Sequence, residues 1–301
     1  MMRKKTKTLV FKRCYFSEGY NGTIEQIISG INDIFPDHKD RVYNPDLFKH
    51  YIISAIEKPI QQEGVFIRIV SHDETGTGII HLKASQRTAD IEEHLPPEDT
   101  QFLENDILLY IVRNHVIACN IGNKDTLITN LILEISTKAS LIDNSTRFRI
   151  ADVPNALEIK KLSDIGVKRI DLDVANYLAN LRDLNKGPRW FQKAFGSPDS
   201  PAALQKKANT CGKLTLSSSG RKKIDEISID DWLTDIGQSI LDDDIRGYTF
   251  ILEDGSRMSS EQLKVTKRVA LRQVGNTTSD DDAKAQTLLF YKELQAKGSL
   301  E

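Results

Sequence analysis

Cationic side chains gather in three short stretches of this sequence, and one stretch interleaves them with aromatic rings. Residues 1–13 hold six Lys/Arg and no acid, residues 186–193 set cations beside Trp190 and Phe191, and residues 217–223 join hydroxyls and a glycine to a basic triplet. Lys and Arg neutralise phosphates, while bases stack on aromatic rings. The residues that we expect to contact a nucleic acid are Lys4, Lys5, Arg189, Trp190, Arg221, Lys222 and Lys223.

These basic residues also have an ordinary structural interpretation. Trp190 and Phe191 are of the kind that pins a loop to the core, and cationic loops also occur on proteins that never meet nucleic acid. A further cationic strip downstream consists of Arg257, Lys264, Lys267, Arg268 and Arg272. Because the net charge of the chain is only −2, binding would have to depend on where the cations gather rather than on the charge of the whole molecule.

Side chains suited to catalysis are present, but they lack the spacing of established motifs. The sequence contains no Gly-x-Ser-x-Gly segment and no Gly-x-x-x-x-Gly-Lys-Ser/Thr loop, and none of its six histidines forms a local ligand pair. His72 and His81 would face each other if their strands form a hairpin. Asp171 and Asp173, with Lys168, have the residue types of a nuclease centre. We predict no metal and no cofactor, and keep a metal-dependent nuclease that uses Asp171 as an alternative.

An acidic segment offers a different kind of surface. Residues 225–244 hold eight carboxylates, and Trp232, Leu233, Ile236 and Ile240 recur within them at helical spacing. The segment is thus predicted to be an amphipathic helix with an acidic outer face, which suits a basic protein partner. An effector or inhibitor that binds another protein through this helix is the main alternative to a DNA-binding protein.

The composition is that of a soluble globular protein. Apolar residues make up 39% and charged residues 28% of the 301 residues, which is enough to bury a core. No window approaches the roughly 18 apolar residues that cross a bilayer, and the basic N-terminus lacks the apolar region of a secretory signal. Cys14, Cys119 and Cys211 are odd in number and widely spaced, which fits a reducing compartment. The sequence therefore predicts a cytoplasmic protein without membrane contact.

Periodicity in the first half predicts the elements that would position these residues. Predicted strands cover residues 9–16, 65–70, 78–83, 107–112 and 115–121, and a turn at 73–77 joins the second to the third. Predicted helices cover residues 24–35, 47–56 and 127–135. Thr23 is the expected cap of the first helix, and Asn44 with Pro45 would begin the second. We expect an antiparallel sheet with packed helices, forming a domain of residues 1–140.

The second half has a weaker but similar pattern. Predicted strands cover residues 148–153, 167–174, 248–252 and 263–271. Predicted helices cover residues 154–162 and 177–184, the acidic segment, and a last helix that starts near Asp282. These elements would form a second, mixed domain of residues 146–301, whose last four residues resemble a cloning scar. The chain as a whole is therefore expected to be of the α+β class.

The order of these elements resembles that of the RexA-type phage-exclusion proteins and, more distantly, of the DNA-binding KwaB component of the Kiwa phage-defence system. The similarity covers most of the chain: a β-hairpin, a polar helical stretch around residues 88–98, a strand–turn–strand unit at 108–121, the apolar helix 127–135 and a β/α second half. It lies in the pattern of elements and in no diagnostic motif, so no residue role is transferred. The resemblance implies a prophage- or bacterium-encoded antiviral protein that dimerises and binds DNA with little sequence preference.

We therefore expect a non-enzymatic DNA-binding protein of a phage-defence or prophage conflict system, which forms a homodimer. Its cations would neutralise phosphates, and Trp190 would stack on a base or anchor its loop.

Overall fold

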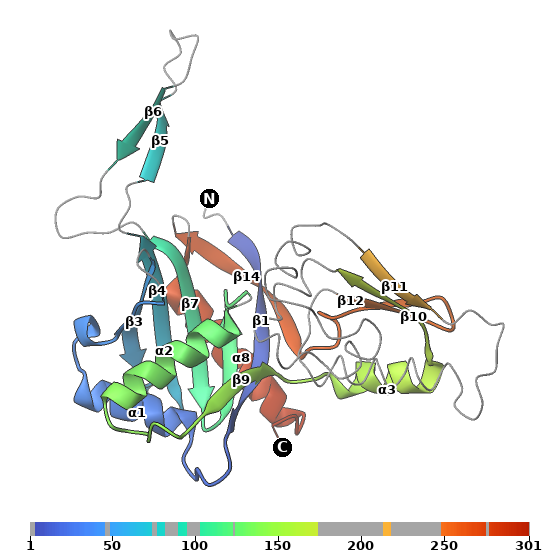
Figure 1. Cartoon of the computed structure of the whole chain (residues 1–301), viewed down its shortest axis with the longest axis horizontal. Coiled ribbons are helices and arrows are strands. Elements are labelled where there is room, and N and C mark those ends of the chain that lie inside the picture. Colours follow the sequence, from blue (N-terminus) through green and yellow to red (C-terminus); the bar gives the residue numbers. More distant parts are fainter. Residues whose placement is uncertain are drawn as a thin grey trace, which may run out of the picture. The chain divides into compact units, whose positions relative to one another are not determined.

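The chain forms two compact units, whose elements are labelled in Figure 1. The first unit contains Met1–Ala151 and Lys267–Glu301, and the second contains Asp152–Thr266. The computed structural model describes residues 4–45, 49–73, 77–81, 90–94, 103–122, 124–173, 213–217, 248–274 and 277–300. The sequence predicted one boundary near residues 140–146. In the structure the second unit is inserted into the first. After residue 266 the chain returns to the first unit, where β14 pairs with β1 and the C-terminal helix α8 packs on β7 and β8.

A nine-stranded sheet forms the centre of the first unit. In sheet order the strands are β15 (Thr277–Thr278), β14 (Thr266–Val274), β1 (Lys4–Phe16), β8 (His115–Cys119), β7 (Leu103–Val112), β4 (Val65–Asp73), β3 (Lys49–Glu57) and β2 (Val42–Tyr43), and β9 (Phe148–Asp152) pairs with β1 outside this order. The central pairs, from β1 through β8, β7 and β4 to β3, are all antiparallel. The predicted α+β class is confirmed.

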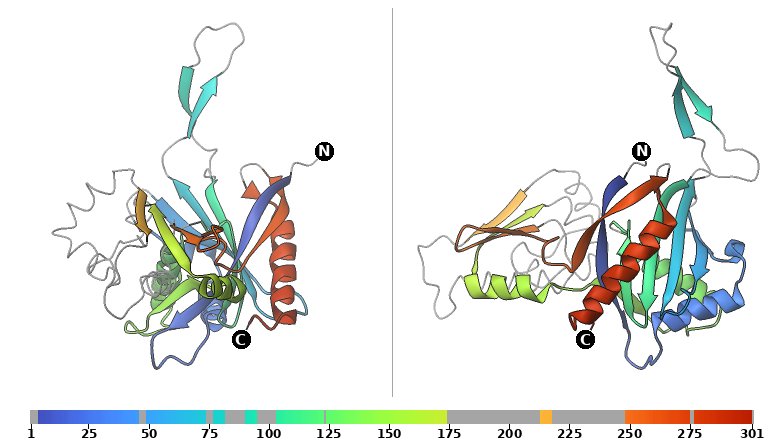
Figure 2. Two further views of the ribbon diagram at one scale, coloured as in Figure 1. Left: turned by 90° about the vertical axis from the view of Figure 1, so that its right-hand side faces the viewer. Right: turned by 180° about the vertical axis from the view of Figure 1, so that it is seen from behind.

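Helices cover both faces of this sheet, as Figure 2 shows. They are α1 (Ile24–Ile34), α2 (Asp125–Lys138) and α8 (Asp280–Ala296), with a short 3-10 turn η1 (His38–Asp40). α1 and α2 lie on one face and α8 lies on the other. Because successive strand residues point to opposite faces, Leu109 of β7 joins the core beneath α1 and α2, whereas Tyr110 lies edge-on to Tyr291 of α8 with ring centroids 5.5 Å apart.

The first helix begins where the sequence predicts, at a capping box. The Thr23 hydroxyl accepts a hydrogen bond from the Gln26 amide at 3.2 Å, and the Gln26 side chain accepts one from the Thr23 amide at 2.9 Å. This reciprocal pair satisfies two of the amides that a helix start leaves without partners. The isoleucines at helical spacing are buried against the sheet.

The predicted hairpin at residues 107–121 is also confirmed, as β7 and β8 joined by Arg113 and Asn114. Arg113 takes the left-handed conformation, with φ of 53°, in place of the usual glycine. The turn is tied to α1, because the Asn114 side chain accepts from the Ile24 amide at 3.0 Å and the Glu25 carboxylate accepts from the Arg113 amide at 2.6 Å.

The second unit contains one described helix and a four-stranded sheet. Its elements are α3 (Ala156–Ile165), β10 (Val167–Asp173), β11 (Lys213–Ser217), β12 (Tyr248–Leu252) and β13 (Arg257–Ser259), and the sheet order is β11-β10-β12-β13. The two chain segments that connect this unit to the first run side by side, since the Val265 amide donates to the Val153 carbonyl at 3.0 Å. A separate two-stranded ribbon consists of β5 (Thr77–His81) and β6 (Asp90–His94).

The helix predicted over residues 47–56 is wrong, because Lys49–Glu57 forms strand β3 between β2 and β4. Ser54 is an extra residue in the ladder with β4: Ile53 pairs with Ile69, and Ala55 pairs with the next residue back, Arg68. Such a bulge breaks the two-residue alternation of apolar side chains. The apolar residues of 47–56 therefore recur at spacings that are also found in a helix, which explains the wrong prediction, although Tyr and Ile favour strands.

Two further expectations about the middle of the chain are wrong. β4 does not pair with β5, because β4 lies between β3 and β7 while β5 pairs with β6. His72 is therefore opposite His50 of β3 and not opposite His81. The stretch around residues 88–98, expected to be helical, contains strand β6.

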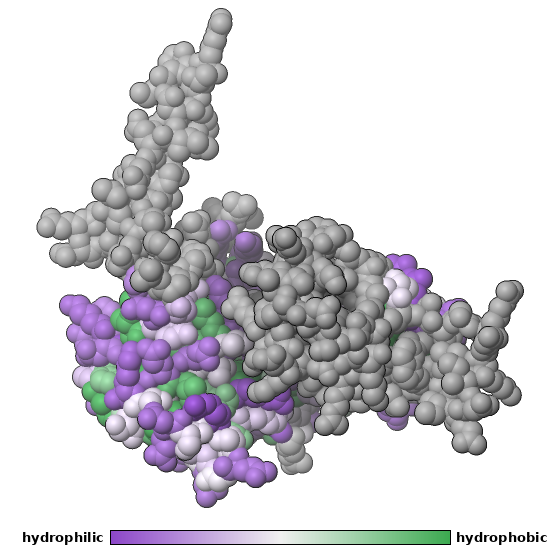
Figure 3. Space-filling model, viewed as in Figure 1, coloured by the Kyte–Doolittle hydropathy of each residue, from purple (hydrophilic) through white to green (hydrophobic). Residues whose placement is uncertain are grey.

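The exposed side of α1 and α2 is largely hydrophilic, with apolar residues scattered between polar ones (Figure 3). This is the surface expected of helices whose apolar stripe faces a sheet. Among the helices in the described part of the chain, none has both the length and the apolar character that crossing a bilayer requires.

Candidate nucleic-acid interface

Lys4 and Lys5 lie at the start of β1 with exposed side chains. The five other residues predicted to contact a nucleic acid are Arg189, Trp190, Arg221, Lys222 and Lys223, and all of them lie outside the described residues. The acidic segment 225–244 lies outside them as well. Of the three predicted basic stretches, the described part of the chain contains only residues 4–13 and residue 217.

The downstream cationic strip is mostly engaged in contacts within the protein. Lys264 is 8% exposed, and its ammonium lies 2.7 Å from the Asp152 carboxylate. Lys267 pairs with Glu293 of α8 at 2.5 Å, and the Arg272 guanidinium donates to the Ser279 hydroxyl at 2.8 Å. A cation that is already bound to a protein carboxylate is a poor candidate for a phosphate contact, because the existing pair must first be broken.

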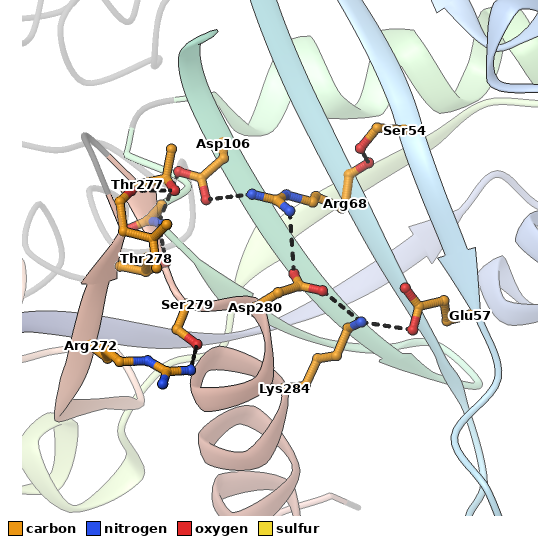
Figure 4. A network of polar contacts seen from close by, with 12 residues as sticks. Ser54, Glu57, Arg68, Asp106, Arg272, Thr277, Thr278, Ser279, Asp280 and Lys284 are labelled. Atoms are coloured by element: carbon orange, nitrogen blue, oxygen red, sulfur yellow. Dashed lines mark hydrogen bonds and ion pairs between the residues drawn. The ribbon is translucent and has the colours of Figure 1, made fainter.

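A network of alternating charges joins α8 to the sheet in Figure 4. The Lys284 ammonium lies 2.7 Å from Glu57 and 2.6 Å from Asp280. The Arg68 guanidinium continues the chain to Asp280 at 3.9 Å and to Asp106 at 3.7 Å. Each cation lies between two carboxylates, so the network leaves no unmatched positive charge for a ligand.

The far end of this network anchors the segment before α8. The Asn120 side chain contacts Asp106 at 3.5 Å and the Thr278 hydroxyl at 3.4 Å. Burial raises the pKa of Asp106, while Arg68 and Lys7 act in the opposite direction. These contacts fix the returning C-terminal segment to the N-terminal sheet, which is a structural task.

A different group of residues lies at an exposed surface: Tyr15 of β1, and Arg147 and Arg149 at β9, which we call the β1–β9 surface. Phe148 and Ile150 of β9 are buried in the core, so the alternate positions Arg147 and Arg149 are exposed. The Arg149 guanidinium lies over the Tyr15 ring, 5.5 Å from its centroid, and Tyr15 remains 42% exposed.

The arginines of β9 differ from Arg68 and Lys284, which lie between carboxylates. Arg147 donates only to the main-chain carbonyls of Asn144, at 2.5 Å, and Thr146, at 2.9 Å. Within the described segments, neither Arg147 nor Arg149 forms an ion pair. Their positive charges therefore remain uncompensated at an exposed surface.

Arg13 and His115 border this surface. The Arg13 guanidinium donates to the Leu300 carbonyl at 2.9 Å and lies 3.4 Å from the His115 ring. Burial lowers the pKa of His115, and the Arg13 charge lowers it further. Both burial and the neighbouring guanidinium thus disfavour the charged form of His115.

The residue types considered for catalysis are occupied or inactive in the structure. The Asp171 carboxylate is 6% exposed and contacts the Arg169 guanidinium and the Thr215 hydroxyl, at 3.2 and 3.0 Å. Burial raises the pKa of Cys119 to about 11 and that of Cys14 to about 12, so both remain thiols at neutral pH. Among the residues that the structure describes, no group of three or more His, Cys, Asp or Glu side chains is placed to hold a metal.

Sequence reasoning missed the β1–β9 surface, although a signal was present. Residues 147–150 alternate Arg, Phe, Arg and Ile, which is the pattern of a strand with one basic face. That Arg149 lies over Tyr15, more than 130 positions earlier in the chain, depends on the pairing of β9 with β1. The chain matches no protein-family model and no curated protein.

Proposed function

We propose that this protein binds DNA without cleaving it, and that the β1–β9 surface is a principal contact. Lys4 and Lys5, exposed at the other end of β1, contribute a second cationic site. The proposal keeps Arg189, Trp190, Arg221, Lys222 and Lys223 as further contacts, on the strength of their sequence pattern. The resemblance to RexA-type proteins supports a role in cytoplasmic phage defence, as a homodimer.

The observation that carries the proposal is the contrast between two classes of cation in the first unit. Arg68, Lys267 and Lys284 each contact a protein carboxylate. Within the described residues Arg147 and Arg149 do not, and Arg149 lies over the exposed ring of Tyr15. Arginines of this kind gain from phosphate contact, because they release counterions from the nucleic acid and break no ion pair with a protein carboxylate.

The near-neutral net charge of −2 bears on how such binding would behave. Non-specific attraction of the whole molecule to DNA is small, so affinity must come from local contacts. Each phosphate contact in duplex DNA contributes roughly 0.9 to the slope of log affinity against log salt. A small number of contacts therefore predicts a shallow but measurable salt dependence.

The test is a titration of the purified chain against labelled DNA at two salt concentrations, with EDTA and with Mg²⁺. We expect salt-dependent binding that Mg²⁺ does not convert into cleavage. In the double variant Arg147→Ala/Arg149→Ala the slope should fall by about two, since two phosphate contacts are lost.

A matched control removes two exposed cations that are already paired, Lys138 with Glu134 and Lys161 with Glu158. The variant Lys138→Ala/Lys161→Ala changes the net charge equally and should leave the slope unchanged. Absence of binding at low salt, an equal loss in both double variants, or DNA cleavage in Mg²⁺ would each contradict the proposal.

A further inference from the structure

We propose that the β1–β9 surface recognises unpaired bases, so that the preferred ligand is single-stranded DNA. This inference rests on the proposed function and specifies the form of DNA that the same surface binds. Its basis is the Tyr15 ring, which is exposed, rigidly supported and in contact with a cation.

The Tyr15 ring is one of the few large apolar side chains of the first unit that are exposed to solvent. Tyr15 is 42% exposed, whereas its neighbour Cys14 is 3% exposed and belongs to the core. Arg149 lies over the ring at a distance typical of a cation–π contact. The guanidinium covers one face of the ring, so a base that stacks on Tyr15 must use the other face or displace Arg149, whose charge can then meet the adjoining phosphate.

The strand segment that carries Tyr15 is held from both sides. The Cys14 amide donates to the Asn114 carbonyl and the Ser17 amide donates to the Arg147 carbonyl, both at 2.8 Å. Phe16 points the opposite way and stacks on Tyr20, with ring centroids 4.5 Å apart. Since the main chain is already ordered, stacking a base on Tyr15 requires little further ordering of the protein.

Duplex and single-stranded DNA would use this surface differently. In a duplex the bases are stacked on one another, so their faces are closed and only the phosphates reach Arg147 and Arg149. In a single strand, phosphates and base faces are both available. Stacking on an aromatic side chain strengthens single-strand binding by roughly 5- to 150-fold for each base. Tyr15 should therefore contribute to binding of single strands and not of duplexes.

The experiment measures fluorescence anisotropy with the full chain and two labelled probes, an oligothymidylate of about 16 nucleotides and a mixed-sequence duplex. We expect Tyr15→Ala to weaken binding of the oligothymidylate by at least roughly fivefold, with less than a twofold change for the duplex. Tyr15→Phe, which keeps the ring, should bind both probes as the original chain does.

Three more variants keep the result interpretable. Tyr15→Leu retains an apolar side chain if Tyr15→Ala destabilises the fold, and it should show the same selective loss because it lacks a ring. Ile34→Ala truncates an apolar side chain of similar exposure, 48%, on α1 and should change neither affinity. Arg147→Ala/Arg149→Ala should weaken the binding of both probes.

The outcomes separate this inference from the proposed function. Base stacking is overturned if Tyr15→Ala and Tyr15→Leu bind both probes normally, or if both variants lose affinity for the two probes equally. DNA binding itself still stands in that case, provided that Arg147→Ala/Arg149→Ala loses affinity for both probes. If the original chain binds neither probe at low salt, the proposed function and this inference are both overturned.

Discussion

Lys12 is fully buried in β1, and its ammonium lies 2.8 Å from the carboxylate of Asp125 in the first turn of α2. A charged group in such a place needs an opposite charge, because removing it from water costs several kcal/mol. At the scale of the residue, this pair is the clearest electrostatic requirement of the fold.

Replacing Asp125 should therefore be costly. Asp125→Ala removes the carboxylate that faces the buried Lys12 ammonium and should lower the free energy of unfolding by about 3–5 kcal/mol, as measured by urea denaturation. Lys12→Met should cost less, since it leaves no buried cation. Glu134→Ala breaks an exposed pair with Lys138 and should cost less than about 1 kcal/mol. Similar losses in all three variants would show that the buried pair has no special importance.

At the scale of the element, the turn between β3 and β4 depends on one glycine. Gly64 has φ of +87°, a conformation that residues with a side chain rarely adopt. A Cβ atom there would lie 2.5 Å from the Ile111 carbonyl oxygen of β7. The turn therefore requires glycine both for its backbone conformation and for its close approach to the neighbouring strand.

Gly64→Ala should lower the free energy of unfolding by at least about 2 kcal/mol, the combined cost of left-handed strain and overpacking. Gly19→Ala is the matched control, because Gly19 has φ of +88° but no atom within 4 Å of the added Cβ. It should show the backbone cost alone, about 1 kcal/mol. Equal losses in the two variants, again from urea denaturation, would mean that the contact with Ile111 is relieved without cost.

At the scale of the whole molecule, the first unit is assembled from two distant parts of the chain. β14 and α8 belong to the C-terminal part, yet β14 lies next to β1, and α8 covers Tyr110 of β7. The N-terminal part alone would expose that apolar face of its sheet. The connecting segments to the second unit lie together, joined by the hydrogen bond between Val265 and Val153.

Excising residues 152–266 and joining the ends with a Gly/Ser linker of about four residues should leave a unit that unfolds cooperatively. Residues 1–151 alone should not, and calorimetry distinguishes the two. The shortened protein that remains keeps the β1–β9 surface and lacks residues 189–223. Its DNA titration therefore also separates the two sets of proposed contacts. If the shortened protein folds but no longer binds DNA, the contacts belong to the second unit instead.

Local sequence patterns determined those elements whose signals lie within a few residues. The Thr23 capping box, the Arg113–Asn114 hairpin and the apolar stripe of α2 all form where they were predicted. In each case the residues that form the pattern lie close together in the chain, so one sequence window contains the whole signal, although distant contacts also stabilise the hairpin turn and α2. The α+β class followed from these elements.

Only the tertiary structure decided which strands pair and which side chains share a surface. The bulge at Ser54 in β3, the separation of β4 from β5 and the placement of Arg149 over Tyr15 all depend on partners far away in the sequence. Strand pairing is fixed by which apolar faces are buried together, and no single window contains that information. The sequence by itself determined an α+β protein of near-neutral charge whose cations gather in short stretches, and the pairing of β9 with β1 decided where its exposed arginines and tyrosine meet.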